Sequence, residues 1–206
     1  MAATEARLDT IDVVLRQLAA TRPLELAAVL FGFAYIALAI RQRRLCWLAG
    51  GLSTALYILV FLDARLYLQS VLQVLYVVLA AYGWWEWGRD ATAGSGIAIR
   101  RWSLLRHAAV IGLVASATAL TAPMLYAWTD AAAPWADAAG TWASVAATWM
   151  MVRKVAANWI WWIGVDAGLA WLYASQGLAF TAVLYLAFAL LAVAGWWAWR
   201  SGSRLA

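Results

Sequence analysis

One stretch of the sequence places an amide, three tryptophans and a carboxylate in otherwise apolar surroundings: NWIWWIGVD, residues 158–166. Asn158, Trp162 and Asp166 are spaced four apart, so they share one face of a helix. An aspartate at the centre of a membrane helix costs about 2.5–3.5 kcal/mol. Two interpretations follow. Asp166 either holds helices together as a protonated or amide-bonded acid, or it belongs to a ligand site.

Two further segments carry polar residues at helical spacing. Gln69, Gln73 and Tyr76 share one stripe, and Thr181 and Tyr185 share another. Lipid cannot satisfy polar atoms, so these stripes are expected to face a cavity together with the Asn158 stripe.

The aromatic residues indicate what such a cavity would hold. Trp161 and Trp162, with Tyr76 and Tyr185, can stack on a flat ring. A carboxylate beside electron-rich rings favours a cationic ring, at about 0.5–2 kcal/mol per cation–π contact. The acid and the deep indoles lie in the second half of the chain, so the ring is expected there. The predicted ligand is a flat, polar, cationic small molecule.

The composition predicts an all-α integral membrane protein. Of 206 residues, 67% are hydrophobic and 12% are charged, against about half and a quarter in soluble domains. Runs of roughly 20 apolar residues suit spanning helices. We predict seven: 24–40, 45–62, 66–87, 108–128, 136–152, 155–173 and 178–199. Residues 1–23 are predicted to form an amphipathic segment on the membrane surface, and residues 88–107 a Gly/Ser-rich linker.

The basic residues predict the orientation of these spans. Lys and Arg mark the cytoplasmic side of short loops, and eleven of the fifteen follow the first, third, fifth and seventh spans. The N-terminus is therefore expected outside and the C-terminus in the cytoplasm. This distribution indicates a topology signal rather than nucleic-acid binding.

An offset of 112 residues aligns two halves of the chain. GWWEW at 83–87 then matches GWWAW at 195–199, Glu25 matches Asp137, and Arg41 matches Arg153. Spans one to three (24–87) become equivalent to spans five to seven (136–199), with span 108–128 as connector. Because one span restores the orientation, the prediction is a 3+1+3 arrangement with a parallel repeat, a transporter architecture with a midplane site.

Other function classes find less support. No nucleophile–base pair, nucleotide-binding loop or metal-ligand cluster is readable, so we predict no catalysis, cofactor or metal. A membrane scaffold whose polar stripes only bind helices is the alternative of another class.

Three motifs resemble the PnuC family of vitamin transporters: LYLQSVLQVLY followed by GWWEW, then NWIWWIGVD, then GLAFTAVLYLAFALLAVAGWWAW. The resemblance implies a 3+1+3 fold like that of the SWEET transporters. It also implies facilitated diffusion of nicotinamide riboside across the bacterial inner membrane, a separate vitamin kinase that traps it, and a homotrimer. Thiamine, or another vitamin with a flat ring, is the alternative substrate. By motif position, the site residues it implies are Gln69, Gln73, Tyr76, Asn158, Trp161, Trp162, Asp166, Thr181 and Tyr185.

Overall fold

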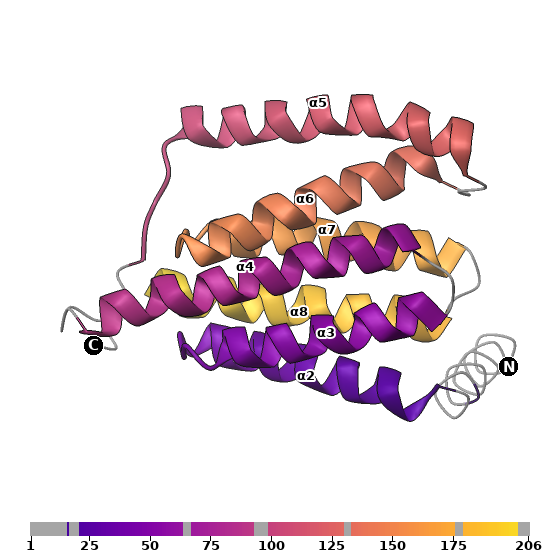
Figure 1. Ribbon diagram of the computed structural model, residues 1–206. Helices are drawn as coiled ribbons and strands as arrows, with labels where there is room; N and C mark the ends of the chain where they lie inside the picture. The colour runs from indigo at the N-terminus through magenta and orange to yellow at the C-terminus, as the bar shows by residue number, and fades with distance from the viewer. Residues whose placement is uncertain are drawn as a thin grey trace, which may run out of the picture.

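The computed structural model describes residues 16, 21–63, 67–92, 99–129, 133–175 and 179–201. Within these residues it contains seven long helices (Figure 1). They are α2 (Pro23–Ile40), α3 (Cys46–Asp63), α4 (Tyr67–Thr92), α5 (Leu104–Trp128), α6 (Pro134–Val152), α7 (Asn158–Ser175) and α8 (Ala179–Ser201). The seven predicted helices are therefore confirmed. Of the predicted amphipathic segment, most lies outside the described residues.

The helix ends differ from the predicted ones where local hydrogen bonds decide them. The linker predicted over 88–107 is shortened from both sides, because α4 continues to Thr92 and α5 begins at Leu104. The Ser103 hydroxyl accepts a hydrogen bond from the Arg106 amide at 3.4 Å, which is an N-cap for α5. Such a cap pairs a backbone N–H group at the helix end. Hydropathy does not take this hydrogen bond into account, so it does not predict where the helix begins.

Four described helices are long and apolar enough to cross a membrane: α2, α3, α5 and α8. Helix α4 carries Gln69, Gln73, Glu86 and Arg89, and α7 carries Asn158 and Asp166, which lowers their hydropathy. Multiple apolar helices with exposed leucines on their outer faces fit a multi-pass membrane protein, since lipid replaces water around them.

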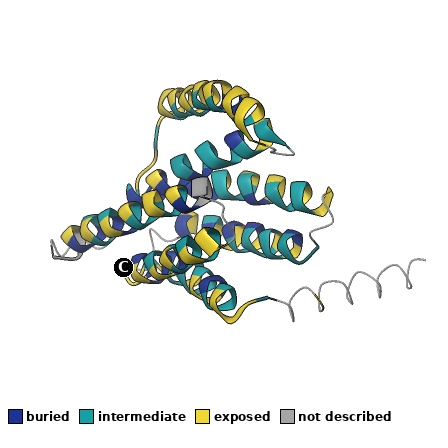
Figure 2. Cartoon of the chain, turned by 45° about the vertical axis from the view of Figure 1, so that its right-hand side comes forward, coloured by how far each residue is buried: buried dark blue, intermediate teal, exposed yellow. Residues whose placement is uncertain are grey.

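The helices form a bundle with one outlying member. Helices α2, α3 and α4 pack in sequence, as do α6, α7 and α8, while α2 contacts α8 and α4 contacts α6. Helix α5 contacts α6 alone among the helices, and lies along one side of the bundle (Figure 1). Its surface is accordingly mostly exposed (Figure 2). We name the bundle end where α2, α4, α6 and α8 finish the basic end, because it carries most of the arginines.

The 112-residue offset recurs in the turns at the basic end. Gln42 after α2 and Lys154 after α6 have φ of 55° and 57°. The Arg43 amide donates to the Leu38 carbonyl, and the Val155 amide donates to the Met150 carbonyl, each at 2.9 Å. A left-handed residue with this hydrogen bond is a Schellman helix end. The same backbone turn thus closes α2 and α6.

The offset also recurs where helices approach most closely. A Cβ on Gly83 of α4 would lie 2.4 Å from the Trp47 ring of α3, and one on Gly195 of α8 would lie 2.5 Å from the Trp159 ring of α7. Both indoles are almost fully buried. Each glycine is therefore required because an indole lies flat against its helix backbone.

We predict that Gly83→Ala destabilises the protein by about 1–3 kcal/mol, the usual effect of overpacking a core. The added methyl cannot fit without moving the buried Trp47 ring. Thermal unfolding of the detergent-solubilised protein, followed by tryptophan fluorescence, measures this as a lower Tm.

Gly164→Ala in α7 is the matched control, because nothing lies within 4 Å of its Cβ position. The control should unfold at or above the wild-type temperature. Equal Tm values for the two variants would contradict the packing argument.

Candidate functional site

A cavity of about 260 Å³ lies between six of the seven helices. Helix α5 contributes nothing to its walls. The lining residues are Gly32, Tyr35 and Ile36 of α2; Trp47, Gly50, Ser53, Thr54 and Tyr57 of α3; Gln73, Tyr76 and Ala80 of α4; Ser144 and Thr148 of α6; Trp159, Trp162, Asp166 and Leu169 of α7; and Tyr185, Phe188 and Ala192 of α8.

The lining follows the 112-residue offset. Eighteen of the twenty residues fall into nine equivalent pairs: Gly32 with Ser144, Ile36 with Thr148, Trp47 with Trp159, Gly50 with Trp162, Thr54 with Asp166, Tyr57 with Leu169, Gln73 with Tyr185, Tyr76 with Phe188, and Ala80 with Ala192. Equivalent positions face the same space from opposite sides. The cavity is therefore built from the same backbone frame twice, with different side chains on it.

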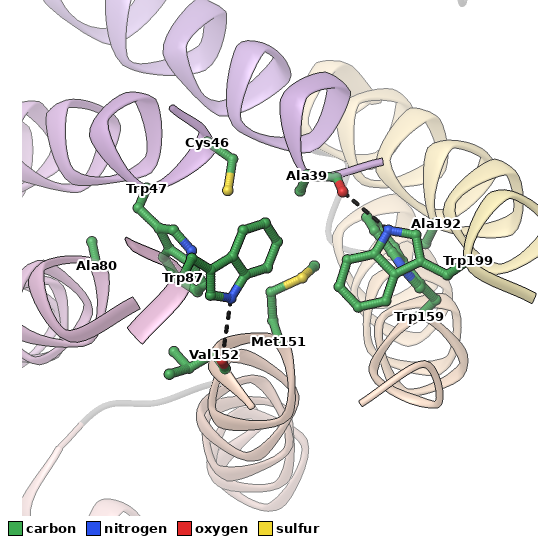
Figure 3. Close-up of a cluster of buried hydrophobic side chains, with 10 residues drawn as sticks. All are labelled: Ala39, Cys46, Trp47, Ala80, Trp87, Met151, Val152, Trp159, Ala192 and Trp199. Atoms are coloured by element: carbon green, nitrogen blue, oxygen red, sulfur yellow. Dashed lines mark hydrogen bonds between the residues drawn. The ribbon is translucent and has the colours of Figure 1, made fainter. Parts of the chain in front are cut away.

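Four tryptophans form a buried cluster at the basic end of the bundle: Trp47, Trp87, Trp159 and Trp199 (Figure 3). Trp47 packs edge-on against Trp87, with ring centroids 5.5 Å apart at 88°. Trp159 packs edge-on against Trp199, again at 5.5 Å and at 86°. Trp47 and Trp159 belong to both the cluster and the cavity wall. The cluster is thus the floor of the cavity.

Two hydrogen bonds tie the two groups of three helices together at this floor. The indole Nε1 of Trp87 in α4 donates to the Val152 carbonyl of α6 at 3.2 Å. The indole Nε1 of Trp199 in α8 donates to the Ala39 carbonyl of α2 at 3.0 Å. We call this reciprocal pair the indole clasp (Figure 3). Each group of helices donates one bond and accepts one.

The Asp166 carboxylate lies on the cavity wall without a partner. Its residue is 5% exposed, and it forms no ion pair or hydrogen bond with any residue that the structure describes. Trp162 lies one helical turn before it, and both line the cavity. A buried carboxyl group without a partner either loses its charge or needs a cation beside it. A cationic ligand in the cavity would supply that partner.

Comparison with known proteins agrees with this geometry. A family model described as nicotinamide mononucleotide transporter matches residues 22–201. The chain belongs to this transporter family. It is also similar in fold to the crystal structure of the vitamin B3 transporter PnuC, with a TM-score of 0.69, 20% identity, and coverage of 94% of this chain and 88% of that one. No individually curated protein matches the sequence.

Membership of the nicotinamide mononucleotide transporter family confirms the resemblance that the motifs indicated. The family and the solved structure are transporters and not enzymes, which agrees with the absence of catalytic motifs from the sequence. It also excludes the alternative of a membrane scaffold that transports nothing.

The structure brings five of the nine sequence-predicted site residues of this family member to the cavity wall: Gln73, Tyr76, Trp162, Asp166 and Tyr185. Trp161 and Thr181 are half-buried and lie outside the lining. Asn158 is fully buried and also lies outside it, where its Nδ2 donates to the Val155 carbonyl at 2.7 Å. The side chain of Gln69 is outside the described part of the chain.

Several lining residues were missed from the sequence, and most lie in the first half. Trp47 and Tyr57 place aromatic rings on the wall from α3, so aromatic chemistry is not confined to the second half. Ser144 and Thr148 place hydroxyl groups on the cavity wall from α6. The 112-residue repeat could have predicted these first-half residues. The equivalents of Trp159, Trp162 and Asp166 are Trp47, Gly50 and Thr54, and all six line the cavity.

We predict that a cysteine at Thr54 reacts quickly with small thiol reagents, because this position opens to the cavity. Wild-type protein supplies the control, since its single cysteine, Cys46, is fully buried. Mass spectrometry of the N-ethylmaleimide adduct should show Thr54→Cys modified once and the wild type hardly at all. Equal modification of both proteins would argue against an accessible cavity at Thr54.

Proposed function

We propose that this family member carries nicotinamide riboside across the membrane by facilitated diffusion, bound in the cavity between α2–α4 and α6–α8. The observation that carries the proposal is the unpartnered Asp166 carboxylate among aromatic rings. The nicotinamide ring of the riboside is a flat cation. Trp162 and the tyrosines would stack on it while Asp166 balances its charge, and Gln73 would bind the hydroxyls of the ribose.

The lining favours the riboside over its phosphorylated form. None of the described lining residues is a lysine or an arginine, and phosphate groups in proteins are normally held by such cations. A phosphate in this cavity would lose its hydration and also be repelled by Asp166. The volume of about 260 Å³ lies just below the usual range for ligand sites, which is roughly 300–1,000 Å³. The mononucleotide in the family's description is therefore the weaker candidate for this chain.

Thiamine is the alternative substrate in the same class. It is also a cation with flat rings, so Asp166 and the aromatic wall suit both vitamins. The preference for nicotinamide riboside rests on the motif resemblance, and direct competition between the two vitamins decides it.

The proposed architecture is a SWEET-like 3+1+3 arrangement, in which α2–α4 and α6–α8 are parallel repeats and α5 connects them. The nine equivalent lining pairs and the reciprocal indole clasp support it. We further propose that the basic end faces the cytoplasm of a bacterial inner membrane, with the N-terminus outside, because arginines gather there. A homotrimer and a separate cytoplasmic vitamin kinase complete the proposal.

Alternating access would then require the indole clasp to open. The clasp and the tryptophan floor separate the cavity from the basic end. Rocking of one group of three helices against the other would break both indole hydrogen bonds and release the vitamin to the cytoplasm. Symmetric repeats make such a rigid-body motion natural.

The test of the substrate is a parallel titration of purified protein with nicotinamide riboside, its mononucleotide and thiamine, followed by tryptophan fluorescence. We expect the riboside to bind at least tenfold more tightly than the mononucleotide. Asp166→Asn should weaken riboside binding about 10- to 100-fold, since opposite charges about 6–10 Å apart attract each other by roughly 1.5–3 kcal/mol at an effective dielectric constant of about 20.

Thr54→Val is the matched control for Asp166→Asn, because it removes a polar group at the equivalent position without changing the charge. It should retain most of the affinity. Tighter binding of thiamine would reassign the substrate within the class. If Asp166→Asn binds the riboside as tightly as the wild type, the carboxylate has no electrostatic role in binding.

We predict that Trp87→Phe opens the cavity toward the basic end more often. The substitution removes the indole donor and leaves the Val152 carbonyl without its bond, at about 1–3 kcal/mol for the closed state. In inside-out vesicles, a membrane-impermeant thiol reagent should then label Thr54→Cys several-fold faster in the Trp87→Phe background.

Trp85→Phe provides the comparison, since Trp85 lies two residues away and is 53% exposed. It makes the same chemical change outside the clasp. Identical labelling rates in the two backgrounds would show that the clasp does not control access.

A further inference from the structure

A second hollow lies at the basic end, away from the cavity. Its volume is about 590 Å³, and it is lined by Arg100, Arg101, Trp102, Arg106 and Arg153. None of these residues lines the cavity between the helices. Four guanidinium groups around one space form a strongly cationic site that the transport mechanism does not use.

Backbone hydrogen bonds hold this arginine group in place. The Arg100 amide donates to the Lys154 carbonyl at 2.8 Å, and the Ala156 amide donates to the Arg100 carbonyl at 3.1 Å. The segment before α5 is thereby fixed to the turn between α6 and α7 as a short parallel bridge. Ile99 packs against the tryptophan cluster beside it. These hydrogen bonds therefore fix the segment that carries Arg100 next to the turn that carries Arg153.

Among the described residues, one of the four arginines has an acidic partner. Arg153 pairs with Glu86 at 3.3 Å. Arg100, Arg101 and Arg106 form no ion pair with any residue in the described part of the chain, and all three are exposed. Like charges that converge on one space repel each other, and an anion between them removes that repulsion. Guanidinium groups bind phosphate oxygens in pairs, which makes phosphate the preferred anion.

The surroundings favour a phosphate that is carried by a lipid. Leu104 and Leu105 follow directly at the start of α5 and are 88% and 80% exposed. Helix α5 is apolar enough to cross a membrane and is covered by α6 alone. A phospholipid would place its headgroup phosphate among the arginines and its acyl chains along α5. Arginines near a membrane surface each strengthen binding to anionic lipid.

We propose that Arg100, Arg101, Arg106 and Arg153 form a phosphate-binding site, occupied by the headgroup of an anionic phospholipid. The site locks the segment before α5 to the turn between α6 and α7 at the membrane surface. It is independent of which vitamin the cavity binds.

The test compares two double variants of the full chain. Arg101→Gln with Arg106→Gln removes two charges from the hollow. Arg41→Gln with Arg43→Gln removes two exposed charges from the turn after α2, at the same end of the bundle. Each protein is purified in detergent and titrated with phosphatidylglycerol, phosphatidylcholine or inorganic phosphate. Native mass spectrometry counts the bound lipid, and thermal unfolding measures the stabilisation.

We expect wild type and the Arg41/Arg43 variant to bind phosphatidylglycerol alike, with little response to phosphatidylcholine. The Arg101/Arg106 variant should bind phosphatidylglycerol about thirtyfold more weakly, at roughly fivefold per arginine. An equal loss of phosphatidylglycerol binding in both variants would show that only the net charge matters, and would contradict the proposed site. Stabilisation by inorganic phosphate alone, lost in the Arg101/Arg106 variant, would retain the phosphate site and assign it to a soluble phosphate.

Discussion

The structure depends on two indole rings packed flat against two glycines. Trp47 lies on Gly83 and Trp159 lies on Gly195, so close that neither glycine has room for a Cβ. This contact sets the distance between α3 and α4 and between α7 and α8. It also sets Trp47 and Trp159 nearly perpendicular to Trp87 and Trp199, whose N–H groups donate to the other three helices. The floor of the cavity and the clasp below it both follow from this packing.

The two sides of the cavity share one backbone frame but carry different side chains, so the cavity is asymmetric. Where the first half places Gly50 and Thr54, the second places Trp162 and Asp166. Thr54 therefore offers a hydroxyl where the second half has a carboxylate, and the ring of Tyr35 fills the space beside Gly50 where the second half has Trp162. In the proposed function, Trp162 and Asp166 bind the flat cation, and the repeated frame supports the rocking of one group of three helices against the other.

Positive and negative groups are separated along the bundle. The cavity holds a carboxylate and no described lysine or arginine on its wall. The arginines gather at the basic end, with four around a hollow of their own. In the proposed function, a cationic ligand meets no described lysine or arginine on the cavity wall. The phosphate site that we propose lies apart from that wall, among the arginines at the surface.

Three features can be predicted from the amino-acid sequence alone: the seven helices, the 112-residue offset, and the polar stripe with Trp162 and Asp166. These features depend on hydropathy and helical spacing, which are local properties of the chain. Packing between helices sets three other features. Trp47 lines the cavity, Asn158 donates to the Val155 carbonyl outside it, and Arg100 and Arg153 line one hollow. Spacing along one helix says which residues share a face. It does not say how far that face is rotated toward its neighbours, because packing between distant helices sets that rotation.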